Sequence, residues 1–154
     1  MTRLEIRIDD HRVHFSGRID DTAQLATLAA KLPAGPIVLD TDGVTFINSI
    51  GMREWIRFVR AAREGGRQIT LDRVADVLMT QMNMINELHG LTVTSFYAQY
   101  ACASCGFEAQ PLIDAVANQQ ALQMLAPPRP PCPECGAAME LADFPERYLS
   151  IFRT

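Results

Sequence analysis

Several features that define specialised protein classes are absent from this chain of 154 residues. No apolar run approaches the roughly 18 residues that a membrane-spanning helix needs. The first residues alternate charged and apolar side chains, which is not the pattern of a signal peptide. We therefore expect a cytoplasmic protein that does not insert into a membrane.

Charge and motif content argue against two further classes. The chain has 14 basic and 18 acidic side chains, a net charge of −4, and residues 98–154 hold three basic and six acidic ones. Because nucleic acids attract basic surfaces, we expect no nucleic-acid partner, and binding of nucleic acid through residues 98–154 is the less favoured alternative. No Ser-His-Asp arrangement, glycine-rich phosphate loop or pair of catalytic carboxylates can be recognised. We therefore do not expect an enzyme.

Cysteine is the residue whose distribution is most informative. It is absent from residues 1–101 and then occurs four times, at Cys102, Cys105, Cys132 and Cys135. Each pair has the form Cys-x-x-Cys-Gly, in which one tight turn directs two sulfurs to one ion. In a reducing compartment such thiols are more often metal ligands than disulfides. Two such turns complete a tetrahedral set, so the spacing predicts one structural Zn²⁺.

The length of the cysteine segment leaves some details open. Four sulfur ligands do not distinguish zinc from iron, so a rubredoxin-like iron site is the alternative. A redox pair would need only one Cys-x-x-Cys motif. The 26 residues between the pairs exceed the roughly 15–20 of a short zinc ribbon, and we predict a helix over Leu112–Leu125 as an insertion. We thus predict an α/β domain at 1–97 and a zinc-ribbon domain at 98–154.

Apolar periodicity predicts an alternation of strands and helices before the cysteines. A charged turn separates two short strands that form a hairpin, and helices separate the later strands. The expected strands are Leu4–Ile8, Val13–Phe15, Ile37–Leu39, Val44–Ile47, Gln68–Leu71 and Leu91–Phe96, and the expected helices are Ala23–Leu32, 50–64 and Ala75–Met84. Such alternation predicts an α/β fold in which helices cover one or both faces of a sheet.

One strand-to-helix turn resembles the signature of a known family. A strand ending at Asp40 is followed by the apolar piece Val44–Ile47 and by Asn48-Ser-Ile-Gly51, which opens a helix. The earlier Phe15-Ser-Gly-Arg-Ile-Asp20 also resembles the family's Gly-x-Leu-Asp segment. In this order of elements, residues 1–97 resemble a STAS domain, the fold of bacterial anti-sigma factor antagonists and of sulphate-transporter tails. The resemblance implies a mixed β-sheet with helices, followed here by the ribbon.

The resemblance also implies a function in signal transduction. In antagonist members, the serine of this motif is phosphorylated by a partner anti-sigma kinase, which binds only the unmodified serine. Carried over, Ser49 is the candidate phosphorylation site, and an anti-sigma factor or similar signalling protein is the expected partner. One alternative is that Asn48 or Ser49 only caps the helix. Another is a non-phosphorylated adaptor, or a transport-associated protein that binds a small ligand.

A basic stripe follows this turn. Arg53, Arg57 and Arg60 recur at helical spacing and share one side of the expected helix. Together with Asn48 and Ser49 they are the candidate partner-binding residues. The alternative is an ordinary solvated surface, because glutamates interleave with the arginines.

Overall fold

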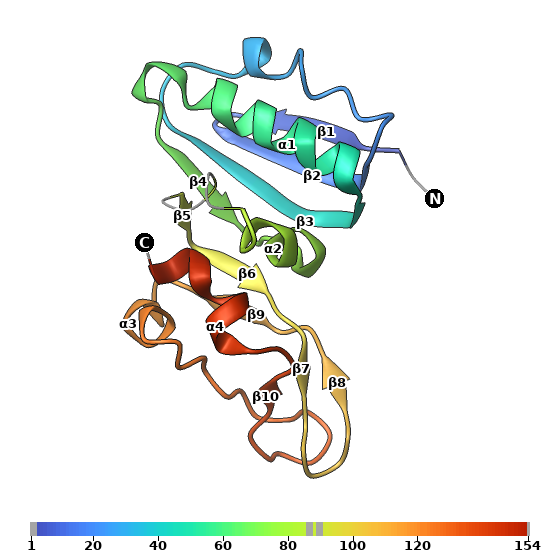
Figure 1. Cartoon of the computed structure of the whole chain (residues 1–154), viewed down its shortest axis with the longest axis vertical. Coiled ribbons are helices and arrows are strands. Elements are labelled where there is room, and N and C mark those ends of the chain that lie inside the picture. The colour runs from blue at the N-terminus through green and yellow to red at the C-terminus, as the bar shows by residue number, and fades with distance from the viewer. Residues whose placement is uncertain (1–2, 86–87, 89–90, 154) are drawn as a thin grey trace.

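The computed structural model of the chain describes residues 3–85, 88 and 91–153, and its architecture is mixed α/β. Five strands form the main sheet in the order β1-β2-β3-β4-β5 (Figure 1). They are β1 (Glu5–Asp9), β2 (Arg12–Ile19), β3 (Ile37–Ile47), β4 (Ile69–Asp72) and β5 (Thr92–Val93). β1 and β2 are antiparallel, whereas the other neighbours are parallel, so the sheet is mixed as predicted.

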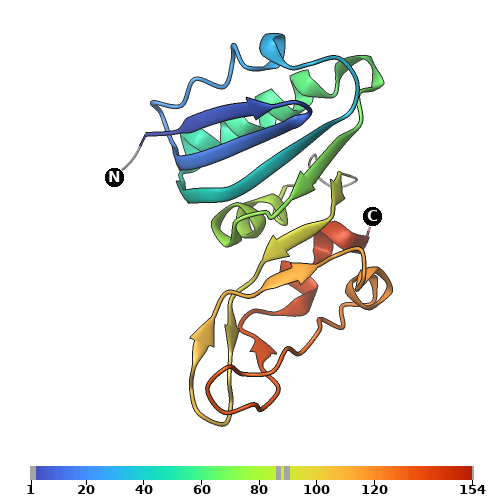
Figure 2. The ribbon, with the colours of Figure 1, turned by 180° about the vertical axis from the view of Figure 1, so that it is seen from behind.

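The two faces of this sheet differ because polar and apolar residues alternate along its strands. In β2, Val13, Phe15 and Ile19 are buried, while Arg12 and His14 are only half-buried on the other side. Helix α1 (Ser49–Ala62) covers the apolar face and lies in front of β1 to β3 in Figure 1. Figure 2 shows the same strands from behind, in front of the helix. We call this second side the open face.

Aromatic side chains fill the space between α1 and the sheet. The ring centroids of Phe15 and Trp55 are 5.3 Å apart, and Phe58 lies within 5.9 Å of both. Such edge-to-face packing adds to the area that the rings bury. Helix α2 (Asp76–Met82) lies beside α1, so that side chains of both helices line one groove. Trp55 is fully buried between α1 and the sheet.

Short strands and helices make up the C-terminal part. β6 pairs with β9, and β7 lies between β10 and β8. The bounds are β6 (Ser95–Tyr97), β7 (Tyr100–Ala101), β8 (Glu108–Ala109), β9 (Leu112–Asp114), β10 (Glu140–Leu141), α3 (Gln119–Gln123), α4 (Pro145–Tyr148) and the 3₁₀ turn η4 (Ser150–Arg153). Within the described residues, no helix is both long and apolar enough to cross a membrane.

Several predicted elements are confirmed near their expected bounds, among them the first hairpin, α1, β4 and α2. The two pieces Ile37–Leu39 and Val44–Ile47 belong to one long strand, β3. The register between β2 and β3 shifts beside Gly43, where an added Cβ would lie 2.6 Å from Cβ of Ser16. The Asp42-Gly43 pair therefore marks an irregularity within a strand, and the prediction of a break was wrong.

The predicted helix Ala23–Leu32 is a second correction. Only the 3₁₀ turn η1 (Ala29–Lys31) forms there. The N–H of Leu28 donates to the carbonyl of Leu25, and that of Lys31 donates to Leu28, so the segment advances by three-residue turns. Leu25 and Leu28 are still buried, and one turn between them is enough to anchor the connection.

The predicted helix Leu112–Leu125 is only partly correct. Its first residues form strand β9, because Ile113 pairs with Phe96 and becomes buried. The Asp114 side chain then accepts hydrogen bonds from the N–H groups of Val116 and Ala117, which turns the chain before α3 begins. The predicted strand Leu91–Phe96 is likewise divided, between β5 of the main sheet and β6 of the small one.

The C-terminal segment packs back against the main sheet region. The Tyr148 hydroxyl lies 2.6 Å from Oδ1 of Asp76 and 2.9 Å from the carbonyl oxygen of Tyr97. The N–H of Ile151 donates to Oδ1 of Asn83 at 2.9 Å. A junction of polar contacts therefore joins α2 to the last residues of the chain.

Candidate functional site

The four cysteines lie in two loops that share one backbone geometry. In the first, the N–H of Cys102 donates to the carbonyl of Phe107, and that of Gly106 donates to Cys102, both at 2.8 Å. The second loop repeats these bonds at equivalent positions, at 2.7 and 2.8 Å. Gly106 has a φ of +79°, and Gly136 has +81°. Glycine adopts this conformation without strain, which explains why it follows each Cys-x-x-Cys pair.

Their sulfur atoms form a compact cluster, all within 4.8 Å of one another. The Sγ atoms of Cys102 and Cys135 are 3.5 Å apart, and those of Cys105 and Cys132 are 3.6 Å apart. Both separations exceed the bond length of a disulfide, about 2.05 Å. They approach the roughly 3.8 Å expected between two sulfurs bound tetrahedrally at about 2.3 Å from a zinc ion. The predicted ligand set is therefore brought together as a candidate metal site.

The thiols do not ionise equally well. Hydrogen bonding from the N–H of Cys105 is the largest cause that lowers the pKa of Cys102, to about 7. For Cys105, the N–H of Phe107 acts in the same direction, but burial and the neighbouring thiols outweigh it and raise the pKa to about 12. Four thiolates at such short distances need a cation between them to ionise together at neutral pH.

Residues outside the loops hold the two cysteine pairs opposite each other. β7 precedes the first pair and hydrogen-bonds to both β10 and β8. The buried Tyr100 hydroxyl donates to the carbonyl of Pro128 at 2.8 Å, which ties β7 to the proline-rich segment before the second pair. The β7–β10 pairing and the Tyr100–Pro128 hydrogen bond both reach across the residues that separate the two cysteine pairs.

A different candidate site lies where β3 ends and α1 begins. Oδ1 of Asn48 accepts a hydrogen bond from the N–H of Gly51 at 2.8 Å, so Asn48 is the N-cap of the helix. Ser49 is the first helical residue and is exposed. Of the two caps that the sequence allowed, the structure selects Asn48. The Ser49 hydroxyl is therefore accessible rather than committed to capping.

Gly51 fixes the start of α1 against the end of β2. A Cβ atom added at Gly51 would lie 1.8 Å from the carbonyl oxygen of Ile19, which no relaxation of a side chain could relieve. The same carbonyl accepts a hydrogen bond from the N–H of Asn48 at 3.3 Å. The glycine of the Asn-Ser-Ile-Gly motif is thus required by a close approach of two backbones.

The basic stripe lines a groove between α1 and α2, with a volume of about 380 Å³. Its walls comprise Ser49, Met52, Arg53, Ile56, Arg57, Arg60, Gln81 and Ile85. Arg53 and Arg57 both lie near Glu54, with N–O distances of 3.7 and 3.4 Å. These ion pairs are exposed and hence weak, so the arginines can exchange them for a partner. The structure brings Ser49 and all three arginines to one groove, whereas Asn48 does not line it.

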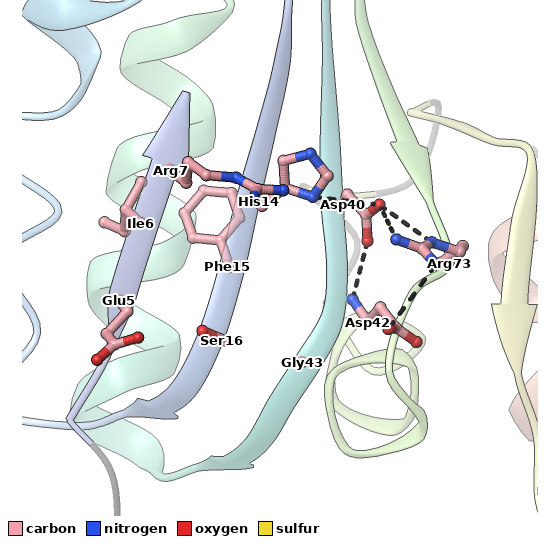
Figure 3. A pocket seen from close by; sticks show the side chains of 10 residues that line it. All are labelled: Glu5, Ile6, Arg7, His14, Phe15, Ser16, Asp40, Asp42, Gly43 and Arg73. Carbon is pink, nitrogen blue, oxygen red and sulfur yellow. Dashed lines mark hydrogen bonds and ion pairs between the residues drawn. The ribbon is translucent and has the colours of Figure 1, made fainter. Parts of the chain in front are cut away.

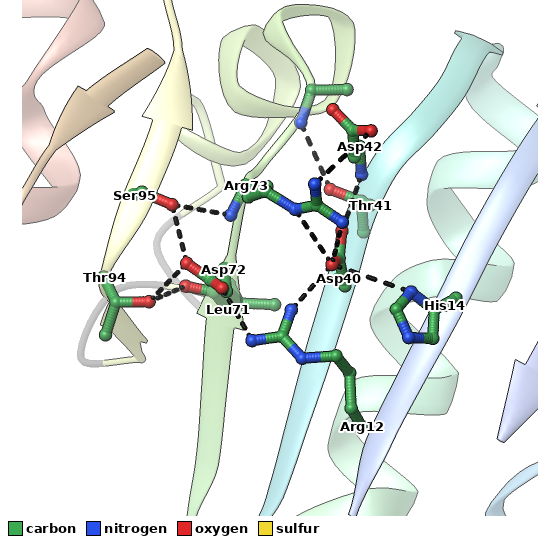
Figure 4. Close-up of polar contacts among 11 residues, drawn as sticks. Arg12, His14, Asp40, Thr41, Asp42, Leu71, Asp72, Arg73, Thr94 and Ser95 are labelled. Atoms are coloured by element: carbon green, nitrogen blue, oxygen red, sulfur yellow. Dashed lines mark hydrogen bonds and ion pairs between the residues drawn. The ribbon is translucent and has the colours of Figure 1, made fainter. Parts of the chain in front are cut away.

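A cluster of charged side chains crosses the open face of the sheet (Figure 4). Its centre is Asp40, whose side chain is 1% exposed. Oδ2 of Asp40 accepts hydrogen bonds from Arg12 at 2.6 Å and from Arg73 at 2.7 and 3.0 Å. Two guanidinium groups thus surround one buried carboxylate and compensate for its removal from water.

Asp72 extends this cluster toward β5 and β6. It is the neighbour of Asp40 in the β3–β4 register. Its Oδ2 accepts a hydrogen bond from Nη2 of Arg12 at 2.8 Å. Its other oxygen, Oδ1, accepts hydrogen bonds from the hydroxyls of Ser95 at 2.6 Å and Thr94 at 2.9 Å. Burial favours a higher pKa for Asp72, yet these hydrogen bonds outweigh it and hold the pKa below its ordinary 3.8.

Sequence reasoning identified Asp40 only as a strand end and missed the cluster around it. One signal was available, because Asp40 and Asp72 each directly follow a predicted buried strand. Parallel neighbours place such residues side by side at one edge of a sheet. The arginines gave no signal of this kind, since Arg12 belonged to the predicted hairpin turn and Arg73 lay between predicted elements.

A hollow of about 570 Å³ adjoins the cluster on the open face (Figure 3). It extends from β1 to Arg73 and is lined by the carboxylates of Glu5, Asp40 and Asp42, the guanidinium groups of Arg7 and Arg73, and the imidazole of His14. Nδ1 of His14 is 3.6 Å from Oδ2 of Asp40. Since arginines and carboxylates both line it, the hollow does not favour an ion of one sign.

The chain was also compared with known proteins. No protein-family model matches it, and no curated protein matches it significantly. The relation to STAS domains is thus a resemblance of motif and element order.

Proposed function

We propose that the chain is a regulatory protein-interaction module of the STAS type, which binds a signalling partner such as an anti-sigma factor or kinase. The observation that carries this proposal is an exposed serine at the first position of α1, beside a groove lined by three arginines. Asn48 already caps the helix, so the Ser49 hydroxyl is accessible to a modifying enzyme. In this function the chain binds and does not catalyse a reaction.

The groove has the chemistry of a docking site for an acidic, amphipathic segment. Met52, Ile56 and Ile85 supply apolar surface between α1 and α2, and the arginines lie around it. A partner helix with apolar residues on one face and carboxylates beside them would complement both features. Charge would then accelerate the encounter, while apolar contacts would slow dissociation.

Phosphorylation of Ser49 would reverse this complementarity. A phosphate adds about two negative charges, which the N-terminus of a helix tolerates. Because Ser49 lines the same groove as Arg53 and Arg57, the phosphate would compete for their charge and repel an acidic partner. The unmodified chain would therefore bind, and the phosphorylated chain would release its partner.

The role proposed for the cysteine cluster is structural, with one Zn²⁺ as the metal. Four sulfur ligands leave no open position at which a substrate could be activated. Strands β7, β8 and β10 have two residues each, too few to hold the loops by pairing alone. Elemental analysis after chelator-free purification should give about one zinc per chain. Iron in its place, or no metal, would contradict this assignment.

The docking proposal is tested by purifying the partner on the immobilised chain from its own cells and then measuring its affinity. Ser49→Asp should weaken binding by tenfold or more, as expected for charge placed inside an interface. Ser49→Ala should bind like the parent, because it keeps the cap at Asn48. Intact-mass analysis of the chain mixed with its partner and ATP should show one phosphate, which Ser49→Ala abolishes.

A matched control separates a local effect from added charge. Thr27→Asp places the same charge on an exposed residue of the connection between β2 and β3 and should leave binding unchanged. Circular dichroism must first show that all variants are folded. A folded Ser49→Asp chain that binds as tightly as the parent would overturn the proposal.

A further inference from the structure

The outer side of strand β1 is an unpaired sheet edge. β1 is the terminal strand of the main sheet and pairs with β2 only (Figure 2). Among the described residues, no backbone hydrogen bond joins Glu5–Asp9 to any segment other than β2. The strand carries no proline and no register shift, so its backbone is free to pair, and its charged residues Glu5, Arg7 and Asp9 oppose pairing unless opposite charges face one another.

Residues of β1 alternate strictly between its two faces. Ile6 and Ile8 lie opposite Phe15 and Val13 of β2 and thus point to the side covered by α1. Ile8 remains 38% exposed there. Glu5, Arg7 and Asp9 are exposed on the open face. Along this edge the charged residues are therefore negative at Glu5, positive at Arg7 and negative at Asp9.

We propose that β1 pairs antiparallel with β1 of a second copy, with Ile6 opposite Ile6 of that copy at a two-fold axis. The axis is perpendicular to the sheet, so both α1 helices lie on the same side. In this register Glu5 is opposite Arg7 of the other copy, and Arg7 is opposite its Glu5. Leu4 is opposite Ile8, and Arg3 is opposite Asp9, again in both directions.

Alternation and charge together select this register from its neighbours. A shift by one residue would place apolar residues opposite charged ones, on the wrong face. A shift by two residues in one direction places Glu5 opposite Glu5 and Arg3 opposite Arg7. A shift by two in the other places Arg7 opposite Arg7 and Glu5 opposite Asp9. Like charges directly opposite each other are destabilising, so among these neighbouring registers the proposed one is the complementary one.

Pairing would also change the hollow on the open face. Glu5, Ile6 and Arg7 form its boundary at β1, and the second copy would add its own β1 beside them. The two hollows would become neighbours on one continuous ten-stranded surface. This arrangement does not depend on Ser49 or on the groove between the helices, which lies on the opposite face.

Sedimentation equilibrium over a range of chain concentrations tests the assembly. The parent should associate to a dimer, and Arg7→Glu should weaken association by about tenfold because both symmetric pairs become repulsive. The double exchange Glu5→Arg with Arg7→Glu restores complementarity in this register and should recover the dimer. Arg63→Glu changes an exposed arginine at the C-cap of α1 and should have no effect on association. A monomeric parent, or a double exchange no better than Arg7→Glu, would overturn the proposal.

Crosslinking tests the register itself. Residues directly opposite in an antiparallel pair have Cα atoms about 4.5–5.5 Å apart, within reach of a disulfide. Ile6→Cys should therefore form a covalent dimer on mild oxidation, whereas Arg7→Cys should not. The parent chain is oxidised in parallel, so that any covalent dimer formed through its four native cysteines can be subtracted. Crosslinking through residue 7 but not residue 6, or equal crosslinking of the parent, would exclude this register.

Discussion

Around α1, three aromatic rings and a long strand bury apolar surface, whereas around the cysteine loops the strands have only two residues each. The sheet region can therefore be stabilised by its own side chains. The cysteine region buries far less and brings four thiols together instead. The difference supports the proposal that a bound metal, rather than a large apolar core, stabilises the cysteine region.

Their junction decides how independent the two regions are. Tyr148 hydrogen-bonds to Asp76 of α2, and Ile151 hydrogen-bonds to Asn83 at the C-cap of that helix. Phe96 packs against Phe152 with ring centroids 5.4 Å apart. These contacts join the end of the chain to the main sheet region but do not involve the cysteine loops. We therefore expect the loops to open separately, while the last residues stay with α2.

The largest effect is expected from Cys132→Ser. It removes one of four metal ligands, and structural metal sites contribute many kcal/mol to the segment they close. Hydrogen exchange in residues 98–143 should accelerate strongly and bound metal should be lost, while α1 and β2 stay protected. Ala103→Ser, an exposed change within the first loop, should retain the metal. Equal acceleration in both regions would show that they are one cooperative unit.

The opposite region is tested by Gly51→Ala. Its new methyl group would collide with the Ile19 carbonyl, so α1 must shift, at a cost of about 3 kcal/mol. Trp55 is the only tryptophan and is fully buried, so its fluorescence reports unfolding of this region in urea. Ile50→Ala, at an exposed neighbour, should cost much less. Metal retained by Gly51→Ala at urea concentrations where the Trp55 transition is complete would show that the cysteine region is separate.

Local sequence signals predicted those parts of the fold that depend on neighbouring residues. Periodicity located α1 because its apolar residues recur over four turns, and the repeated Cys-x-x-Cys-Gly identified all four clustered thiols. The predictions for Ala23–Leu32 and Leu112–Leu125 were wrong or partly wrong because apolar residues there are buried by partners distant in sequence. Ile113 becomes a strand residue through Phe96, which no local pattern reveals.

The same reasoning explains what was found and missed at the candidate sites. Ser49 and the arginines were identified because they are near one another in the chain. The cluster around Asp40 was missed because Arg12 and Arg73 reach it from other strands and a later turn. Its assembly depends on the order of strands in the sheet, and that order was not predicted.

A smaller effect is expected from Tyr148→Phe, which acts on the junction. Burial, and then the nearby Asp76, raise the pKa of Tyr148, so its hydroxyl stays protonated and can donate. Removing it leaves Asp76 without this partner and should cost about 1–3 kcal/mol. Two transitions should then occur at different urea concentrations. One is the loss of Trp55 fluorescence, and the other is the detachment of the C-terminal segment, which hydrogen exchange measures. Tyr100→Phe removes a hydroxyl within the cysteine region and should not separate them.

The smallest effect concerns acid. The folded pKa of Asp72 is below its ordinary 3.8, so the ionised side chain stabilises the fold. That contribution is complete above pH 3.8 and is lost as the pH falls through the lowered folded value. Asp72→Asn should therefore cost about 1 kcal/mol near neutral pH, and its difference from the parent should shrink in acid. Asp21→Asn, at an exposed residue after β2, should match the parent throughout.

Acid also distinguishes the two regions, because it acts on each through different groups. Cysteine thiols must lose their protons to bind a metal, so protons compete with the metal for the sulfur atoms. This competition does not depend on whether Asp72 is ionised. Asp72→Asn should consequently change the pH dependence of the Trp55 transition and leave the pH dependence of metal release unaltered. If both curves shift together, the charge cluster on the open face and the cysteine loops are coupled through β6, where Ser95 binds Asp72.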